Sequence, residues 1–494
     1  MAERKPNFSS LPPELRLLVL QSLAEAHSQP TSSCRGIAAY ASVCKHWQLF
    51  FEPITFKYFI IRHEDLVDFR KVTQPYRRRC MIKHVWLRLE EPSPEQRQDM
   101  GLDSQNWSKA FYTSIIWHLW TTFSDWKLAT VGEFDGNPGL TLEHSGHKHL
   151  TESATGAMPT DDLDMYSKFQ ETGSVSIYEE DGRKYYVSKD MEGAMDPKTR
   201  RDLFCKGFRL DDTKPLPRLE VVTELVTRRA CTRNLRPEVM ALIFNSLTRL
   251  QTVRIERWRH GLVSPEGDWC LGMEPVLSQH LPASLKALSV FEESGTRNSR
   301  FDLIPKDKLT EAVIMGTLHL KCLSLCFVIN AEAFLDRICT GQPQQLNGGY
   351  IELTSLTLTS DSLKAEINEE WDMSLWLRGV RDLIYLAAMA AKRMPKLRLM
   401  EIWNSGDGTS SIFQYKKADD DAFEISWKST QNCNPFEDDV VQAWREAVVE
   451  RGQSEVTISP PMLLSGDFEY YGSTIPYLKS RNMVLHPVSA AQMK

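Results

Sequence analysis

The chain has 494 residues, of which 42% are hydrophobic and 25% are charged, and its formal net charge at pH 7 is -6. This composition is typical of a soluble globular protein and excludes a wholly disordered chain, and the length predicts more than one structural unit. The acidic balance argues against an overall electrostatic design for nucleic acid.

No apolar run approaches the roughly 20 residues that span a bilayer. The N-terminus lacks the apolar core and the cleavage site of a secretory signal. We therefore expect no membrane partner and a location in the cytoplasm, the nucleus or both.

The first predicted element is a small helical domain over residues 8–60. Pro12 and Pro13 stand where a helix can begin, and apolar residues follow at helical spacing as far as Leu23. A polar stretch over 27–36 interrupts this pattern, which resumes at Ile37. Two or three short helices follow from this pattern, and they are too few to bury a core alone.

Two fragments of this domain, LPPELRLLVLQSL and SVCKHWQLF, together resemble the F-box. The segment between them, 24–35, is longer than is usual, and Ser32 or Ser33 must stand where an F-box typically has Asp. An F-box docks on the Skp-type adaptor of cullin-based ubiquitin ligases, so the resemblance implies the same partner here. The residues that it assigns to the adaptor interface are Leu11, Pro12, Glu14, Leu15, Val19, Leu20, Leu23, Val43, Cys44 and Trp47. The alternative is that these residues pack onto the rest of the chain.

The sequence contains no strong motif for catalysis or metal binding. Cys44 lacks a suitable base, because His46 is two residues away on a predicted helix and points to another face. His144, His147 and His149 stand in a predicted polar surface loop, and the ten Cys residues form no close CxxC pair. We therefore expect no catalytic residue, no metal, no cofactor and no enzyme activity.

From about residue 80 the sequence repeats the pattern apolar-x-x-apolar-x-apolar. The repeats begin at Ile82, Leu216, Leu250, Leu285, Leu320, Leu353 and Leu397, and the steps from 216 are 34, 35, 35, 33 and 44 residues. Candidate helices lie between them at 237–247, 308–316, 331–339 and 377–393. Strands that alternate with helices at a near-constant period predict a solenoid. The predicted fold is therefore α/β, with the F-box followed by an irregular leucine-rich-repeat-like domain over 80–403.

Further elements interrupt or close this solenoid. An aromatic helix is predicted at 107–126 and one more strand at 137–145. Residues 146–215 are predicted as an insertion, with a hairpin that turns at Asp181-Gly182 and a helix near 196–204. Residues 404–494 are predicted as a C-terminal cap with a tail, in which a hairpin over 411–427 precedes a helix that ends at Gly452. This layout resembles that of F-box proteins from filamentous fungi.

Strand alternation predicts which side chains face away from the repeat helices. If Leu288 and Val290 point into the core, the next residue, Phe291, lies on the opposite face. Applied to the other repeats, this register gives as client-binding candidates Arg254, Glu256, Trp258, Phe291 and Trp403. Aromatic residues mixed with Arg and Glu are typical of a binding surface. The sequence leaves open the alternative that the C-terminal hairpin and helix cover these aromatic residues as a second core.

The expected function is that of a substrate-recognition subunit of an Skp-cullin-F-box ubiquitin ligase. The F-box would bind the adaptor, and the repeat domain would bind a client protein. One alternative is an adaptor-binding scaffold protein that acts outside a ligase, and another is a solenoid that carries an unrecognised enzyme.

Overall fold

A computed structural model describes most of the chain. The described residues are 8–27, 35–99, 101, 107–126, 139–147, 207–211, 214–229, 231, 233–259, 263–293, 304–341, 350–365, 372–417, 422–450, 455–468 and 471–491. The hairpin predicted at Asp181-Gly182 and the helix predicted near 196–204 lie outside these residues. In the described part, no helix combines the length and the apolar character that crossing a membrane requires.

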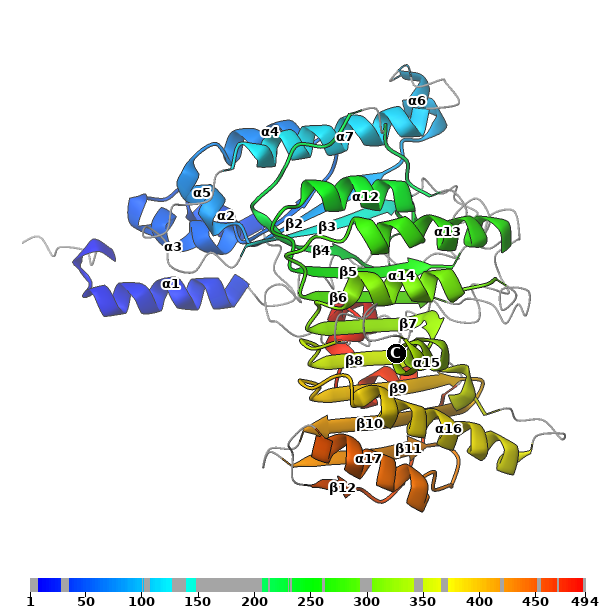
Figure 1. Cartoon of the computed structure of the whole chain (residues 1–494). Coiled ribbons are helices and arrows are strands. Elements are labelled where there is room, and N and C mark those ends of the chain that lie inside the picture. Colours follow the sequence, from blue (N-terminus) through cyan, green and yellow to red (C-terminus); the bar gives the residue numbers. More distant parts are fainter. Residues whose placement is uncertain are drawn as a thin grey trace, which may run out of the picture.

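One sheet of 13 strands organises the molecule (Figure 1). The strands are β1 (Tyr58–Ile61), β2 (His84–Glu90), β3 (Leu140–His147), β4 (Val222–Thr227), β5 (Thr252–Trp258), β6 (Ala287–Glu293), β7 (Cys322–Asn330), β8 (Ser355–Thr359), β9 (Leu399–Gly406), β10 (Thr409–Lys417), β11 (Phe423–Ser429), β12 (Val456–Ile458) and β13 (Met462–Leu463). They lie side by side in sequence order as far as β12, and β13 pairs with β11. Strands β1 to β9 are parallel, whereas β10 runs antiparallel to both of its neighbours. The predicted α/β class is confirmed.

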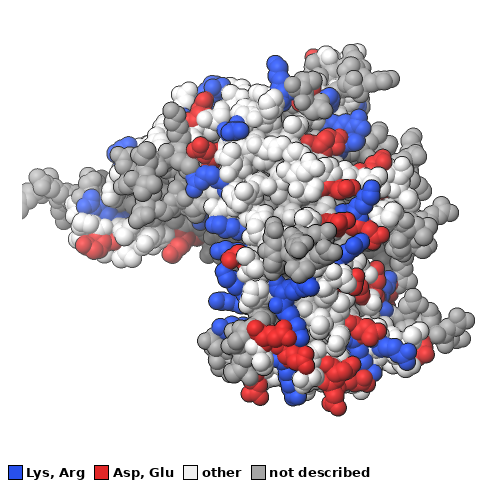
Figure 2. All heavy atoms as spheres, viewed as in Figure 1, with Lys and Arg blue, Asp and Glu red and all other residues white. Residues whose placement is uncertain are grey.

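A layer of helices covers one face of this sheet (Figure 1). It contains α7 (Trp107–Ser124), α12 (Pro237–Ser246), α13 (Val263–Gln279), α14 (Asp307–Thr317), α15 (Ala331–Thr340), α16 (Met373–Ala391) and α17 (Asp438–Glu450). All of these except α13 were predicted from the sequence, with small differences at the ends. Pro275 stands inside α13 and weakens its helical signal. Acidic and basic side chains are intermixed over this side of the molecule among the residues coloured in Figure 2.

The repeated apolar pattern produces an aligned row of core residues. Val253 pairs with Leu288, Leu288 with Leu323, Leu323 with Leu356, and Leu356 with Met400. All of them are buried in the large core between the sheet and the helices. Parallel strands stack in register here because each unit repeats the same apolar spacing after a similar number of residues.

In the first of the evenly spaced repeats, the sequence pattern placed the strand too early in the chain. β4 begins at Val222, whereas the predicted pattern ran from Leu216 to Val221. Leu225 is the residue that pairs with Val253. Leu219 is buried, but it only forms an isolated bridge before the strand. Apolar spacing alone does not distinguish a strand from the buried turn before it.

Short helices make up the N-terminal part. They are α1 (Pro13–His27), α2 (Arg35–Tyr40) and α3 (Lys45–Thr55), followed by α4 (Leu66–Val72), α5 (Tyr76–Met81) and α6 (Pro94–Asp99), and a 3-10 turn at Phe8–Ser10 precedes α1. A second 3-10 turn, at Asp361–Leu363, belongs to the repeat domain and follows β8. Leu20, Ile37 and Phe51 form the small core of the first three helices. The sheet begins at Tyr58, inside the range 8–60 that the sequence assigned to the helical domain.

A buried ion pair connects α3 to α5. The carboxylate of Glu52 is buried and lies 2.9 Å from the guanidinium of Arg78, and Arg77 contacts its other oxygen at 2.5 Å. Burial raises the pKa of Glu52, but its bonds to Gln48 and Arg78 and the charges of both arginines lower it by more. These contacts orient the small helical domain relative to the start of the sheet.

Close packing of α13 on α14 makes Gly316 difficult to replace. A Cβ at Gly316 would collide with the backbone carbonyl of Leu277, whereas a Cβ at Gly379 in α16 would meet open space. We predict that Gly316→Ala destabilises the protein by about 1–3 kcal/mol through overpacking. Gly379→Ala is the matched control and should stabilise it by up to about 1 kcal/mol through helix propensity. Midpoints of urea unfolding measure both, and equal shifts in the two variants would contradict this packing.

Candidate functional site

An exposed apolar groove lies along α1. Its volume is about 470 Å³, and its lining consists of Leu11, Leu15, Leu18, Val19, Ser22 and Leu23. Leu18 is 56% exposed and Leu15 is 47% exposed, which is unusual for two leucines one turn apart. Four residues that the F-box resemblance assigned to an adaptor interface, Leu11, Leu15, Val19 and Leu23, therefore lie together on one surface.

The other predicted adaptor residues have mixed positions. Pro12, Glu14, Val43 and Cys44 are exposed, and Cys44 is the residue that precedes α3. Trp47 is partly buried against the small core of the first three helices.

Leu20 differs from the prediction. It is 1% exposed and packs on Ile37 and Phe51. Leu20 points away from the groove, towards α2 and α3. It therefore belongs to the core of the helical domain and not to the predicted adaptor interface.

The five client-binding candidates lie on the second face of the sheet, the face opposite the helix layer. Trp403 and Phe291 are 0% and 1% exposed, Glu256 and Trp258 are also buried, and Arg254 is partly buried. The predicted side of the sheet is correct. Of the two alternatives that the sequence left open, an exposed binding surface and a covered second core, the structure shows the covered one.

The cover of the second face is the C-terminal segment (464–491), of which the structure describes residues 464–468 and 471–491. It contains two 3-10 turns, Tyr471–Ser473 and Ile475–Tyr477, and the short helices α18 (Arg481–Val484) and α19 (Pro487–Ala491). In Figure 1 it lies behind the sheet, on the side away from the helices. The predicted hairpin and helix, now β10, β11 and α17, instead extend the sheet and the helix layer.

An aromatic cluster forms where this segment meets the sheet. The ring of Tyr471 lies with its centroid 5.1 Å from that of Phe327 and 5.7 Å from that of Phe291. Phe327 in turn lies 5.3 Å from Trp403. Three strands, β6, β7 and β9, thus supply three rings: those of Phe291 and Phe327 lie beside Tyr471 of the C-terminal segment, and that of Trp403 lies beside Phe327.

Phe327 reaches the second face because of an irregularity in β7. Its φ is 65°, a left-handed conformation that is rare for a residue other than glycine, and the register with β8 shifts at this point. Strand alternation from Leu323 and Leu325 would otherwise direct the ring towards the helices. The irregularity therefore adds a third sheet aromatic residue to the cluster.

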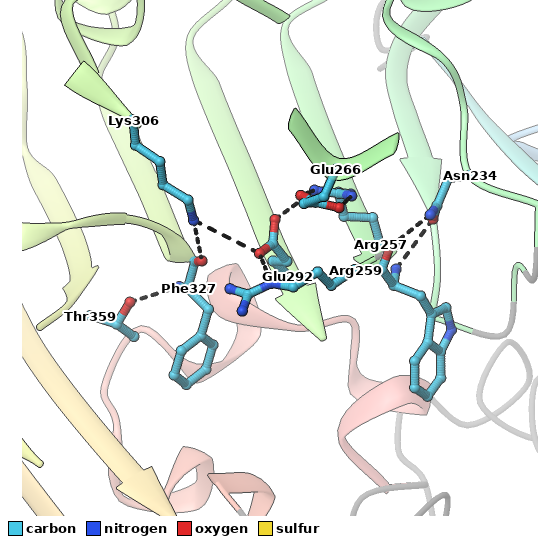
Figure 3. Close-up of polar contacts among 9 residues, drawn as sticks. Asn234, Arg257, Arg259, Glu266, Glu292, Lys306, Phe327 and Thr359 are labelled. Atoms are coloured by element: carbon cyan, nitrogen blue, oxygen red, sulfur yellow. Dashed lines mark hydrogen bonds and ion pairs between the residues drawn. The ribbon is translucent and has the colours of Figure 1, made fainter. Parts of the chain in front are cut away.

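Polar contacts hold Phe327 in this conformation (Figure 3). Its backbone N–H donates to the hydroxyl of Thr359 at 2.7 Å, and its carbonyl accepts from the ammonium group of Lys306 at 3.4 Å. Lys306 also lies 4.0 Å from Glu292. Figure 3 shows the ring pointing away from these contacts, towards the C-terminal segment.

Glu292 belongs to a buried charge network at the ends of β5 and β6 (Figure 3). Arg257 donates to Glu266 of α13 at 2.6 Å and to Glu292 of β6 at 2.5 Å, and Arg259 donates to Glu292 at 2.7 Å. Burial lowers the pKa of Arg257, but Glu266 and Glu292 raise it by more, so it lies above its ordinary value. This network fixes the strand ends from which the aromatic cluster is built.

Charged groups of the second face bind the main chain of the C-terminal segment. Glu401 of β9 accepts from the backbone N–H groups of Lys479 and Ser480 at 2.9 and 2.8 Å. The hydroxyl of Ser480 also donates to Glu401, and so does the side chain of Gln414 at 2.6 Å. The Glu401 carboxylate therefore accepts hydrogen bonds from N–H groups at the start of α18, where a helix offers no carbonyl acceptor of its own.

The opposite end of α18 is bound through its carbonyl groups. The guanidinium of Arg254 donates to the carbonyl of Asn482, and the hydroxyl of Ser289 donates to that of Met483, both at 2.6 Å. Glu256 accepts from the backbone N–H of His486 at 2.5 Å. Arg254 and Glu256, which the sequence analysis proposed for client binding, thus contact this chain's own C-terminal segment.

His486 lies among buried charges at the far end of the segment. Burial is the main cause that lowers its pKa well below the ordinary value, and the nearby Arg228 and Arg254 lower it further, whereas Glu143 raises it. Glu143 is fully buried and accepts from Arg228. Burial raises the pKa of Glu143, but Arg228 and His84 lower it by more, to about 2.

His144 corrects another sequence prediction. The strand predicted at 137–145 is confirmed as β3, but His144 does not lie in a polar surface loop: it is buried in this strand beside Phe208, with the ring centroids 5.0 Å apart. Burial lowers the pKa of His144 to about 4. The side chains of His147 and His149 lie outside the described residues, and in the described part no group of three His, Cys, Asp or Glu side chains could hold a metal ion.

Part of the chain matches a known family model. Residues 280–486 match the model of a family described as "Family of unknown function (DUF6546)". No curated protein matches the chain. The matched region begins before β6 and ends at His486, so it contains the aromatic cluster and most of the C-terminal segment, and it does not contain α1 to α3.

One periodic signal could have identified the C-terminal segment from the sequence. Leu464, Phe468, Tyr471, Ile475 and Leu478 follow one another in steps of 4, 3, 4 and 3 residues. This spacing is typical of a segment that buries one apolar face. All five residues belong to the second core that the segment forms with the sheet.

The burial of His486 predicts a pH dependence of stability. Its folded-state pKa is lowered, so the unfolded chain takes up a proton first as the pH falls below about 6.5, and the folded state loses stability. His486→Asn removes this titration and can still accept from the backbone N–H of Val488, as the imidazole does at 3.2 Å. Between about pH 7.5 and about pH 5.5, we expect the variant to lose about 1 kcal/mol less than the wild type.

Urea titrations at the two pH values measure this difference. His46→Asn changes an exposed histidine of α3 and is the matched control. An equal loss of stability in the wild type and His486→Asn would show that His486 is not buried in its neutral form.

Proposed function

We propose that the chain is a substrate-recognition subunit of an Skp-cullin-F-box ubiquitin ligase, in which α1 to α3 bind the Skp-type adaptor. The observation that carries this proposal is the exposed apolar groove of α1. Leu11, Leu15, Val19 and Leu23 belong to the part of the sequence that resembles an F-box, and all of them line the groove.

The energetics of the groove favour a protein partner. Burying one exposed leucine or valine contributes roughly 1.5–3 kcal/mol, so the groove residues together represent a large unused driving force for association. α1 projects from the sheet in Figure 1. The described residues therefore do not support the alternative that this face of α1 packs on the rest of the chain.

The remaining architecture fits a client-binding domain of the leucine-rich-repeat-like type. Its parallel strands follow one another in sequence order, and its helices lie on one face. In Figure 1, α1 lies beside the ends of the strands, away from the helix layer. Tethering adaptor and client to one chain would raise the concentration of the client near the ligase, and this chain would perform no chemistry itself.

A binding assay with a purified Skp-type adaptor tests the proposal. We predict that the wild type binds and that Leu15→Ala combined with Val19→Ala weakens binding at least tenfold, because both truncations remove apolar contacts at the centre of the interface. The matched control is Leu271→Ala combined with Leu375→Ala, which truncates leucines that are 61% and 63% exposed on α13 and α16. No capture by the wild type, or equal binding by the groove variant, would refute adaptor binding.

The same variants separate a ligase subunit from the alternative scaffold. If the chain works in a ligase, affinity purification recovers the adaptor and a cullin together, and the groove variant loses both. Recovery of the adaptor without a cullin would favour an adaptor-binding scaffold that acts outside a ligase.

A further inference from the structure

We infer that the second face of the sheet is a peptide-binding site whose resident ligand is the chain's own C-terminal segment, and that a client binds by replacing it. The client would be a peptide of the same chemistry: an aromatic side chain at the place of Tyr471, followed by apolar residues and a short helical turn at the place of Ser480. That the client is a ligase substrate rests on the proposed function. That a peptide can replace the C-terminal segment on the second face does not rest on it.

The sheet supplies the aromatic pocket without help from the segment. Phe291, Phe327 and Trp403 come from three strands, and the contacts of Lys306 and Thr359 with the backbone of Phe327 are all made within the repeat domain. Tyr471 of the C-terminal segment lies beside two of these rings, Phe291 and Phe327. An arrangement of aromatic residues that is fixed in advance around one ring is typical of an anchor pocket in a protein interface.

The polar contacts are directed at groups that every peptide has. Glu401 and Glu256 accept from backbone N–H groups, and Arg254 and Ser289 donate to backbone carbonyls. A peptide with a different sequence but the same turn could make these bonds. The aromatic pocket would then provide the specificity, and the charged groups would fix the register of the turn.

The second core is also built differently from the first. The core under the helices is mainly an apolar row, with its buried charges gathered in the network of Arg257, Glu266 and Glu292. The second face instead mixes aromatic residues with Arg254, Glu256, Ser289 and Glu401 beneath the C-terminal segment. Buried charges are a poor source of stability relative to apolar side chains, and water can solvate them once the cover leaves. Such a composition is that of an interface.

The position of the segment allows it to leave without opening the sheet. The last strand, β13, ends at Leu463, before the segment begins. The strands beneath it keep their pairing with one another and their packing against the helices. The attachment of the segment to the same chain gives it a high effective concentration, on the order of millimolar, so a client must compete with it.

Hydrogen exchange on the full-length wild type tests whether the segment opens independently. We expect the backbone amides of Lys479, Ser480 and His486 to exchange through local opening, at least tenfold faster than the amides of β7 and β8 that pair in the sheet. If these amides exchange only together with the strands, in global unfolding, the segment is a permanent part of the core and the inference is wrong.

A labelled peptide with the sequence of residues 464–491 tests the exchange directly. Full-length chain carrying Tyr471→Ala and Ser480→Ala should bind this peptide at least tenfold more tightly than the wild type, because its own segment competes less well. Tyr477→Ala is the matched control, since this tyrosine of the same segment is 39% exposed. A peptide with Tyr471→Ala should bind the double variant at least tenfold more weakly than the unchanged peptide.

Adding Trp403→Ala to the double variant should abolish peptide binding, because the pocket loses one of its three rings. Equal affinity of the peptide for the wild type and the double variant would overturn the inference, as would unchanged binding after Trp403→Ala. None of these measurements contains the adaptor. Failure of adaptor binding would therefore refute the proposed function alone, and failure of peptide exchange would refute this inference alone.

Discussion

A parallel sheet has two faces, and proteins almost always cover both of them. In this chain each of the strands β4 to β8 is followed by a helix that lies over the same face, so these repeats cover one face only. The sheet nevertheless has a buried second face, because the last residues of the chain run back across β9, β6 and β5. The position of every candidate binding residue of the repeat domain follows from how this second face is covered.

The two cores meet different physical demands. Between sheet and helices, the same apolar position recurs in successive units, so in-register stacking produces a dry row of Val, Leu and Met side chains. On the second face the C-terminal segment brings irregular backbone, whose N–H and C=O groups need partners when they are buried. Glu401, Glu256, Arg254 and Ser289 provide those partners. The charges on this face thus serve the irregular chain that lies over them.

The N-terminal helices, in contrast, leave an apolar surface uncovered. Leu20, Ile37 and Phe51 form a core that is small for a domain, and the groove side of α1 is without cover among the described residues. The molecule covers its second sheet face with its own chain, yet leaves Leu15 and Leu18 exposed, and this exposed surface is where the proposed adaptor would dock. The two surfaces therefore differ: the groove of α1 is exposed, whereas the C-terminal segment covers the second face of the sheet.

Local pattern was sufficient for much of the fold. The helices α12, α14, α15, α16 and α17, the hairpin of β10 and β11, and most repeat strands follow from periodicity and turn residues. The pattern also placed Phe291 and Trp403 on the face away from the helices, because side-chain alternation is a property of any strand. Predictions failed where short-range signals were ambiguous: at Leu216 and Leu219, which are apolar but precede β4, and at His144, which is buried in β3 although its neighbours in the sequence are polar.

The sequence by itself determined the α/β alternation, the side of the sheet to which each repeat residue points, and the apolar face of α1. Only the tertiary structure decided that Leu20 faces inward, that Phe327 turns to the second face and that residues 464–491 cover the client-binding candidates. The physical reason is that alternation and helical period depend on neighbours within one turn or one strand. Burial depends on which distant segment returns to the same place, and contacts such as those of Glu401 with Lys479 and Ser480 join residues that no local pattern relates.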